Sequence, residues 1–280
     1  MTTRKRFRFL ERQRPTRRPA HGRRAERPIL KDAADIAALQ RAGHLVAQAF
    51  DLLGDAVRPG ARLDALDALV EAFIREHGAE PLYKGYRGTP PTHPPFPGVI
   101  CASVNHEICH GTPRPLALAE GDIVGIDIGL KLDGFCGDAC VTFPVGRISA
   151  EAERLLAVAR ECLYRGIDAA RAGHRLYDIG HAVQSHAEAH GYSVVREWGG
   201  HGIGRRLHEA PSVPHTGERE NDLVLRPGMV FTIEPMINAG GAACQLTGDG
   251  WTVVTADGSL SAQFEHTIAI APEGPLILSQ

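Results

Sequence analysis

The stretch GDIVGIDIGLKLDGFCGDA, residues 121–139, combines two strand-like runs, a turn signal and two acidic residues. The dipeptide Asp133-Gly134 between the runs is typical of tight hairpin turns. Asp127 lies in the first run and Asp138 in the second. Because a hairpin pairs its strands side by side, both carboxylates can reach one region of a sheet. Carboxylates among apolar strand residues are costly to bury unless they are paired or bind a metal, so this hairpin predicts a charged functional site.

Three further residues lie in strand-like or glycine-rich surroundings: His201 in GGHGIGRRLHE, Glu234 in FTIEP and Glu265 in QFEHT. Taken singly, such residues are usually ordinary edge, turn or loop residues. If they converge with the two aspartates, the four carboxylates carry a charge of −4, which a dry site tolerates only with cations. Two divalent ions balance that charge, and oxygen ligands with one nitrogen suit Mn²⁺, Fe²⁺, Co²⁺ or Zn²⁺.

Helical and strand-like segments alternate in pairs along the chain. Apolar residues at helical spacing predict helices from Asp32 to Arg58, Leu63 to His77, Ser149 to Ala172 and Leu176 to His190. The predicted strands are Val99–Val104, Ile123–Leu132, Phe135–Phe143, Val230–Pro235, Trp251–Thr255 and Gln263–Ile270, with Asp257-Gly258 as a second hairpin turn. The chain thus has two helices followed by strands, and then the same order again. This order indicates an α+β protein built from a duplicated half.

The overall composition is that of a folded, intracellular protein. A chain of 280 residues with 43% hydrophobic and 23% charged residues can bury a sizeable core. No apolar run approaches the length of a membrane span, and no hydrophobic leader follows the N-terminus. The six cysteines show no CxxC pair or zinc-finger spacing, which predicts reduced thiols and a cytoplasmic location.

The N-terminus differs in charge from the rest of the chain. Residues 1–31 hold twelve Lys or Arg and two Glu, a net charge of +10, whereas the remainder carries −12. We expect residues 1–28, with three prolines and no apolar periodicity, to form a disordered basic arm before a catalytic domain at 29–280. The arm could be a tail without a role, an organellar transit peptide, or a contact for an anionic surface such as ribosomal RNA.

Five stretches closely resemble the type I methionine aminopeptidases. They are CASVNHEICHG (101–111), GDIVGIDIGLKLDGFCGDA (121–139), GHGIGRRLHEAPSVPH (200–215), LRPGMVFTIEPMIN (225–238) and DGWTVVTADGSLSAQFEHT (249–267). The resemblance spans roughly residues 30–272 and implies the pita-bread (creatinase/aminopeptidase) fold, two pseudo-symmetric halves around a dinuclear metal site. It also implies a monomeric hydrolase that removes the initiator methionine of nascent polypeptides when the second residue is small, by attack of a hydroxide shared between two ions.

The same resemblance assigns roles to individual residues. Asp127 is expected to chelate one metal ion, His201 and Glu234 the other, and Asp138 and Glu265 to bridge them. Glu234 is also expected to carry a proton during catalysis. The substrate-facing residues are expected to be His110 and His208, at the scissile amide and the tetrahedral intermediate, with Tyr86, Cys101 and Trp251 shaping the methionine pocket.

Some positions depart from the family pattern. Gly129 and Ala139 stand where the family commonly has hydroxyl residues, and Leu207 replaces an aromatic residue before His208. The loop at 89–97 is longer than usual, so Phe96 or His93 is expected to reshape the pocket entrance. Two alternatives remain on the sequence: a proline-directed peptidase such as prolidase or aminopeptidase P, and a binding protein of the same fold that has lost catalysis.

Overall fold

The computed structural model describes residues 27–88, 91–217 and 223–280. The predicted basic arm therefore lies outside the described residues, except for Arg27 and Pro28, and so do positions 89 and 90 of the pocket loop.

The four predicted helices are confirmed. They are α1 (Ala33–Ala56), α2 (Leu63–Glu76), α3 (Ala150–Ala169) and α4 (Leu176–Ala189). Asp32 and Ser149 cap α1 and α3, because their side-chain oxygens accept hydrogen bonds from backbone N–H groups of the first turn. The third helix ends at Ala169, three residues before the predicted end, and Gly173 follows with a left-handed φ of 87°.

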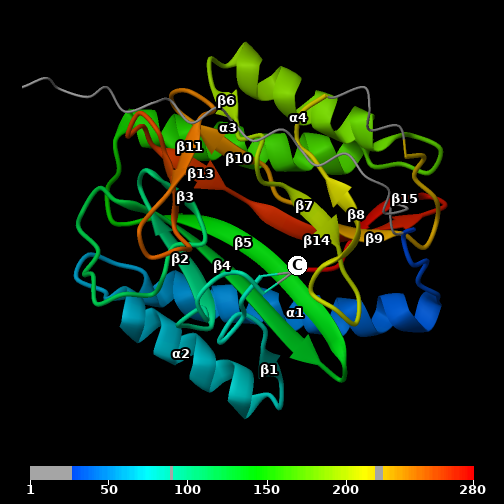
Figure 1. Ribbon diagram of the computed structural model, residues 1–280, viewed down its shortest axis with the longest axis horizontal. Coiled ribbons are helices and arrows are strands. Elements are labelled where there is room, and N and C mark those ends of the chain that lie inside the picture. The colour runs from blue at the N-terminus through cyan, green and yellow to red at the C-terminus, as the bar shows by residue number, and fades with distance from the viewer. Residues whose placement is uncertain (1–26, 89–90, 218–222) are drawn as a thin grey trace, which may run out of the picture.

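A nine-stranded sheet forms the centre of the molecule (Figure 1). Its strands are β1 (Glu80–Pro81), β2 (Ile100–Val104), β4 (Ile123–Leu132), β5 (Phe135–Pro144), β7 (Gly200–Gly202), β8 (Glu209–Val213), β9 (Val230–Ile233), β14 (Glu265–Ala271) and β15 (Gly274–Ile277). The main order is β1-β4-β5-β14-β9-β7-β8, with β2 on β4 and β15 on β14. The predicted hairpin of β4 and β5 is confirmed, and its turn residues Asp133 and Gly134 both have positive φ.

Two three-stranded sheets complete the described strands. One joins β13 (Ser261–Gln263), β10 (Met236–Asn238) and β6 (Ser193–Val194), and the other joins β11 (Cys244–Leu246), β12 (Val253–Thr255) and β3 (Glu107–Cys109). The hairpin predicted at Asp257-Gly258 is wrong, since β12 and β13 belong to different sheets. The Asp257 carboxylate accepts hydrogen bonds from the backbone of Gly241 and Ser259, which turns the chain out of one sheet and into the other.

Two predicted strands are each divided where they pass from one sheet to another. Val230–Pro235 ends in the large sheet at Ile233, and β10 begins in a small sheet at Met236. Pro235 has no N–H group to continue a ladder, which accounts for this break. Gln263–Ile270 is divided at Phe264 in the same way. Glu234 and Glu265 therefore lie at the junctions between sheets.

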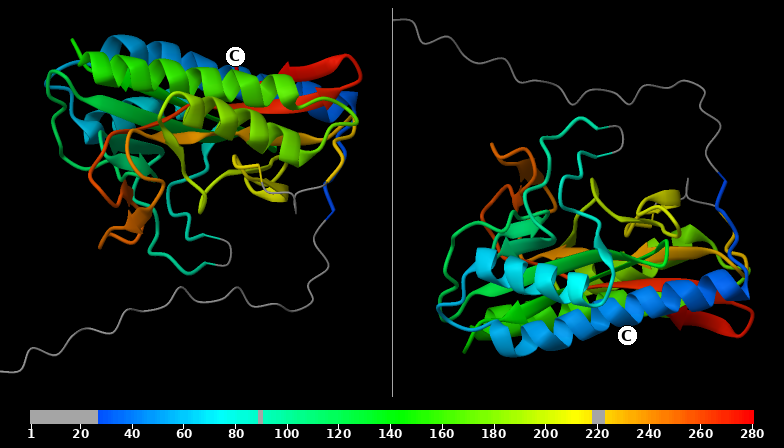
Figure 2. Two further views of the ribbon diagram at one scale, coloured as in Figure 1. Left: turned by 90° about the horizontal axis from the view of Figure 1, so that it is seen from above. Right: turned by 90° about the horizontal axis from the view of Figure 1, so that it is seen from below.

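The helices cover one face of the large sheet, and loops with the small sheets cover the other (Figure 2). Alternation along β4 explains this: Val124, Ile126 and Ile128 are fully buried in the same apolar cluster as residues of α1 and α2. A separate cluster packs α3 and α4 against β9 and β14. Two helix pairs on two parts of one sheet give the pseudo-symmetric α+β halves expected of the pita-bread fold.

The two parts of the sheet meet at a narrow contact. Strands β4 and β5 are paired over ten residues each, whereas β5 and β14 are paired only at Cys140–Glu265 and Ala139–His266. Within the described ranges, no helix is long and apolar enough to span a membrane.

Candidate active site

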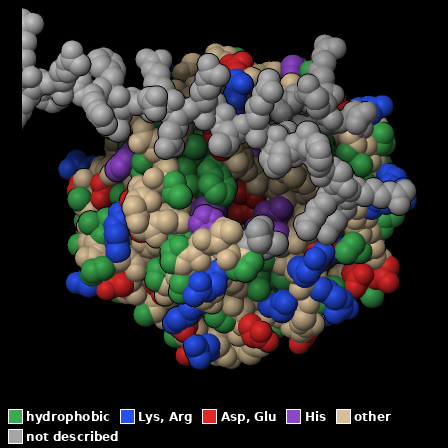
Figure 3. Space-filling view, viewed as in Figure 1, with side chains coloured by type: hydrophobic (Ala, Val, Ile, Leu, Met, Phe, Trp, Pro, Cys, Tyr) green, Lys and Arg blue, Asp and Glu red, His purple; other side chains and the backbone are tan. Residues whose placement is uncertain are grey.

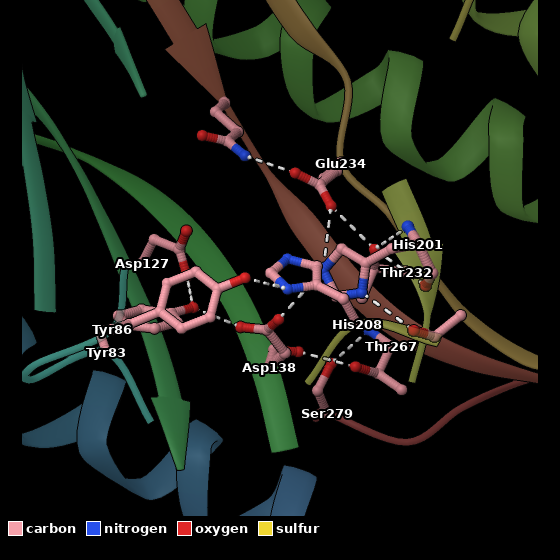
Figure 4. A network of polar contacts seen from close by, with 12 residues as sticks. Tyr83, Tyr86, Asp127, Asp138, His201, His208, Thr232, Glu234, Thr267 and Ser279 are labelled. Atoms are coloured by element: carbon pink, nitrogen blue, oxygen red, sulfur yellow. Dashed lines mark hydrogen bonds and ion pairs between the residues drawn. The ribbon is translucent and has the colours of Figure 1, made fainter. Parts of the chain in front are cut away.

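The five residues predicted as metal ligands come from five adjacent strands. Asp127 lies on β4, Asp138 on β5, Glu265 on β14, Glu234 directly after β9, and His201 on β7. Cys140 is paired with Asp127 on one side and with Glu265 on the other, so the side chains of this row share one face of the sheet. This is the face away from the helices, and Figure 4 shows the labelled ligands close together on it.

Ligand atoms of three of these side chains lie close enough for one ion. Atoms of Asp138, His201 and Glu265 are all within 4.8 Å of one another. Nε2 of His201 is 3.5 Å from Oδ2 of Asp138 and 3.8 Å from Oε1 of Glu234. Asp127 joins the group through the Tyr83 hydroxyl, which lies 2.5 Å from a carboxylate oxygen of both Asp127 and Asp138.

The electrostatics of the cluster favour cations. Burial raises the pKa of Asp127 and of Glu265 well above the ordinary range, and repulsion from Asp138 adds to both shifts. Burial likewise raises the pKa of Glu234 to about 7, despite the opposing effect of His201. Carboxylates that resist ionisation in this way become favourable as anions when a divalent ion lies among them. The donor set therefore fits a metal centre.

The His201 imidazole is oriented for coordination. Its Nδ1 lies 3.1 Å from the carbonyl oxygen of Gly202, and because a carbonyl only accepts, Nδ1 carries the proton. Nε2 is then left facing the carboxylates, the usual arrangement for a ligating histidine. Burial alone would lower the pKa of His201, but Asp138 and Glu234 raise it to about 9.

Several residues that support the ligands were not identified from the sequence. Thr232 Oγ1 and Gln263 Nε2 donate to the two carboxylate oxygens of Glu234, at 2.8 and 3.2 Å. The backbone N–H of Glu234 donates to Nε2 of His215 at 3.0 Å, and burial lowers the pKa of His215 to about 3, so this ring is a neutral acceptor. In the sequence, only the position of Thr232, Gln263 and His215 inside the stretches FTIEP, QFEHT and VPH could have indicated this supporting role.

One cavity of about 470 Å³ contains all ten predicted site residues in its lining. They are Tyr86, Cys101, His110, Asp127, Asp138, His201, His208, Glu234, Trp251 and Glu265. Figure 3 shows the corresponding hollow, with acidic side chains at its floor and histidines beside them. The cavity thus joins the acidic cluster to the predicted substrate pocket.

Two neutral histidines stand over the acidic cluster. Burial lowers the pKa of both His110 and His208 to about 4. The His208 ring lies 4.3 Å from that of His201 and its Nδ1 is hydrogen-bonded to the Tyr86 hydroxyl at 2.9 Å. The edge of His110 meets Trp198 at a ring distance of 4.8 Å, another lining residue that the sequence did not indicate. At neutral pH both imidazoles can donate or accept one hydrogen bond.

Part of the cavity lining is apolar. Tyr83, Phe96, Cys101 and Trp251 form one buried cluster, with Leu207 packed against it. Phe96 meets Trp251 edge to face at 5.3 Å, and Trp251 donates its indole N–H to the carbonyl of Pro94. Burial raises the pKa of the Cys101 thiol well above its usual value, so this residue is an uncharged wall.

Two residues of the loop at 89–97, His93 and Phe96, line the cavity. Phe96 is 3% exposed and lies inside the apolar cluster rather than at the rim. The His93 ring contacts that of Trp251 in a tilted arrangement, with ring centres 4.8 Å apart, and its Nδ1 is hydrogen-bonded to the carbonyl oxygen of Gly250. Both side chains therefore fix the position of the tryptophan ring.

Comparison with known proteins gives a consistent result. Residues 37–272 match metallopeptidase family M24. A methionine aminopeptidase of Clostridium perfringens is 46% identical over 251 residues, covering 90% of this chain and 98% of the relative. The crystal structure of methionine aminopeptidase from Rickettsia prowazekii superposes with a TM-score of 0.87 at 42% identity, over 91% of this chain and 100% of that one.

Proline-directed enzymes are more distant. A prolidase from Pyrococcus furiosus matches with a TM-score of 0.72 at 21% identity, over 90% of this chain and 66% of that chain, which shows a common fold only. The expected pita-bread fold is thereby confirmed. From these matches and the motifs on five adjacent strands, the chain belongs to metallopeptidase family M24 and, within it, to the methionine aminopeptidases.

Proposed function

We propose that this protein is a methionyl aminopeptidase that removes the first methionine of nascent polypeptides when the second residue is small. The observation that carries the proposal is that one cavity is lined both by the acidic cluster and by the apolar, aromatic cluster. The catalytic unit is proposed to be residues 29–280, acting as a monomer in the cytoplasm.

Two divalent ions are proposed for the acidic cluster. Asp127 would hold one, His201 and Glu234 the other, and Asp138 and Glu265 would lie between them. The oxygen-rich set with one imidazole nitrogen suits Mn²⁺, Fe²⁺, Co²⁺ or Zn²⁺. When bound, such ions polarise the scissile carbonyl and lower the pKa of the attacking water.

The side chains around the ions divide the remaining work. Glu234 takes the proton of the attacking water and returns it to the leaving amine. His208 donates to the oxyanion as it develops, and His110 contacts the scissile amide from the other wall. Because a free amine would supply a further nitrogen ligand to the ions, the arrangement favours cleavage of the first peptide bond over internal bonds.

The apolar end fits a thioether side chain. A flexible, polarisable methionine makes favourable contacts with aromatic rings and with a neutral thiol. Trp251 and Tyr86 supply the rings, Cys101 supplies the thiol, and Phe96 packs edge to face with Trp251. A β-branched or charged first residue would fill this space poorly or bury an unpaired charge.

Peptide turnover by metal-restored enzyme tests the proposal. The protein is stripped with a chelator, each of the four metals is added back, and Met-Ala-Ser, Leu-Ala-Ser and Ala-Pro are compared. Met-Ala-Ser should be cleaved with a kcat/KM at least about tenfold above Leu-Ala-Ser, since a misfit in an apolar pocket costs roughly 1–3 kcal/mol. Faster cleavage of Ala-Pro would favour the proline-directed alternative, and failure to retain any metal would favour the non-catalytic binding protein.

A further inference from the structure

The Tyr83 hydroxyl contacts two of the proposed metal ligands at once. It lies 2.5 Å from Oδ1 of Asp127 and 2.5 Å from Oδ1 of Asp138, and the Tyr83 residue is 8% exposed (Figure 4). The segment that carries it is fixed to the sheet, because the N–H of the preceding Leu82 donates to the carbonyl of Gly129 at 3.0 Å. The hydroxyl therefore has a defined position between the two carboxylates.

Gly129 makes room for the tyrosine ring. It lies two residues after Asp127 on the same face of β4 and is paired with Asp138 of β5. A Cβ atom at Gly129 would lie 2.5 Å from Cε1, 2.8 Å from Cζ and 3.0 Å from the hydroxyl oxygen of Tyr83. Any side chain at this position would therefore displace the ring.

We propose that Tyr83 is a positioning residue that fixes the carboxylates of Asp127 and Asp138, and that Gly129 is the position that permits it. The inference rests on the proposed metal site. A threonine hydroxyl is one bond beyond Cβ, and Cβ of residue 129 would lie 3.0 Å from the Tyr83 oxygen. A hydroxyl between the carboxylates of Asp127 and Asp138 can therefore come from a tyrosine at position 83 or from a threonine at position 129, and in this chain it comes from Tyr83.

The physical effect is to restrict carboxylate rotation. A phenolic hydroxyl has one hydrogen, so it donates to one carboxylate at a time, and the second contact needs a proton or a cation nearby to offset repulsion. Groups that hydrogen-bond to ligating carboxylates fix their orientation, and their removal commonly weakens metal binding or activity by about 10–100-fold.

The Tyr83→Phe variant removes only the hydroxyl. Metal-free protein is titrated with Mn²⁺ against a fluorescent chelator in the absence of peptide, with Tyr177→Phe on α4 as the matched control. We expect Tyr83→Phe to bind at least one ion about tenfold more weakly while its circular dichroism stays unchanged. Equal affinities for wild type, Tyr83→Phe and Tyr177→Phe would overturn the proposal.

A second pair of variants tests the exchange of hydroxyl positions. In a Tyr83→Ala background, Gly129→Thr restores a hydroxyl, and Gly129→Val restores the same volume without one. Recovery of Mn²⁺ affinity by Thr, at least threefold above Val, supports the proposal. Equal affinities for Thr and Val would mean that the space is merely filled, which overturns it.

Measuring ion binding without peptide keeps this inference separate from the proposed function. Wild-type protein that binds no Mn²⁺ would overturn the metal site itself. Wild-type protein that binds Mn²⁺ but does not cleave Met-Ala-Ser would overturn only the proposed specificity, and the Tyr83 comparison would still be decided by the affinities.

Discussion

Glu265 lies in the active site at the point where the two parts of the large sheet meet. It is 2% exposed, lies at the start of β14 and is paired with Cys140 of β5, in the row that also contains Asp127. Burial is the largest cause that raises the pKa of Glu265, and the nearby carboxylates of Asp138 and Glu234 raise it further. So much like charge around a buried carboxylate is unfavourable in the metal-free fold, which supports the proposal that Glu265 is a metal ligand.

Replacing Glu265 with alanine should therefore abolish turnover without unfolding the protein. We expect kcat/KM for Met-Ala-Ser to fall about 100-fold or more, because a lost ligand removes several kcal/mol of charge stabilisation. Glu273→Ala, an exposed residue between β14 and β15, is the matched control. A Glu265→Ala enzyme that kept a tenth of wild-type activity with metal restored would contradict the assignment.

The metal-free protein should lose stability as pH rises from about 6.5 to 9. The pKa of His201 is raised from 6.5 to about 9, so its stabilising effect is present below 6.5 and is lost through 9. The raised pKa values of Asp127 and Glu265 act in the same direction. Four histidines with lowered pKa oppose this only below 6.5, because above it they are neutral in both states: His110, His208, His215 and His266.

Thermal melting of chelated and metal-loaded protein at several pH values checks this. The Tm of the chelated form should fall across the window, and the increase in Tm on adding Mn²⁺ should grow, because ligands must be deprotonated to bind. His201→Gln should flatten the decline. A chelated form whose Tm rises with pH between 6.5 and 9 would refute the account.

At the scale of elements, a buried ion pair ties the start of α1 to the strand that follows His208. Nζ of Lys31 lies 2.5 Å from the Glu209 carboxylate, and the two side chains are 6% and 4% exposed. The other Glu209 oxygen accepts from the N–H of Arg206, so the turn before His208 is held from both sides. Removing one member leaves a buried charge without its partner.

The variant Lys31→Met should lower the free energy of unfolding by about 3–5 kcal/mol, measured by urea denaturation. The pair of Lys84 and Glu71, with side chains 46% and 19% exposed, provides the more exposed comparison, and Lys84→Met should change stability by about 0–1 kcal/mol. The double variant Lys31→Met, Glu209→Gln should recover part of the loss, because no uncompensated charge remains. Similar effects of Lys31→Met and Lys84→Met would rule out this role.

Some of the helices, strands and site residues could be predicted from the sequence, and others could not. The β4–β5 hairpin and the four helices follow from local patterns, and the predicted metal ligands follow from the sequence motifs that contain them. Strands β7 and β8 were not predicted, because GHG has no strand propensity and pairs only through contacts distant in sequence. Tyr83 was missed for the same reason: its significance depends on Gly129, 46 positions away, and no local periodicity links them.

For the whole molecule, charge separates the N-terminus from the rest of the chain. A net charge of +10 precedes a remainder of −12. An enzyme acting on nascent chains would benefit from a contact with the anionic ribosomal surface near the exit. The eleven Lys and Arg of residues 1–28 could neutralise several phosphates, which makes affinity fall steeply with salt.

Deleting residues 1–28 should leave kcat/KM on short peptides unchanged and weaken co-sedimentation with ribosomes at low salt. The full-length protein should be released as salt rises from about 50 to 200 mM. A variant with the arm's Lys and Arg replaced by Gln controls for length. Equal co-sedimentation of all three proteins would show that the N-terminus has no docking role.

The narrow contact between β5 and β14 gives the proposed ions a mechanical consequence. Strands β5 and β14 are paired at two positions and are also joined by a hydrogen bond from the Thr267 hydroxyl to the carbonyl of Asp138. Asp127 and Asp138 lie on one side of this seam, and Glu265, Glu234 and His201 lie on the other. Ions with ligands on both sides of the seam would hold the two halves together. Metal depletion should then weaken the contact between the two halves as well as stop catalysis. Metal-free enzyme would be degraded faster by proteases, so the supply of metal in the cell would set the lifetime of the protein.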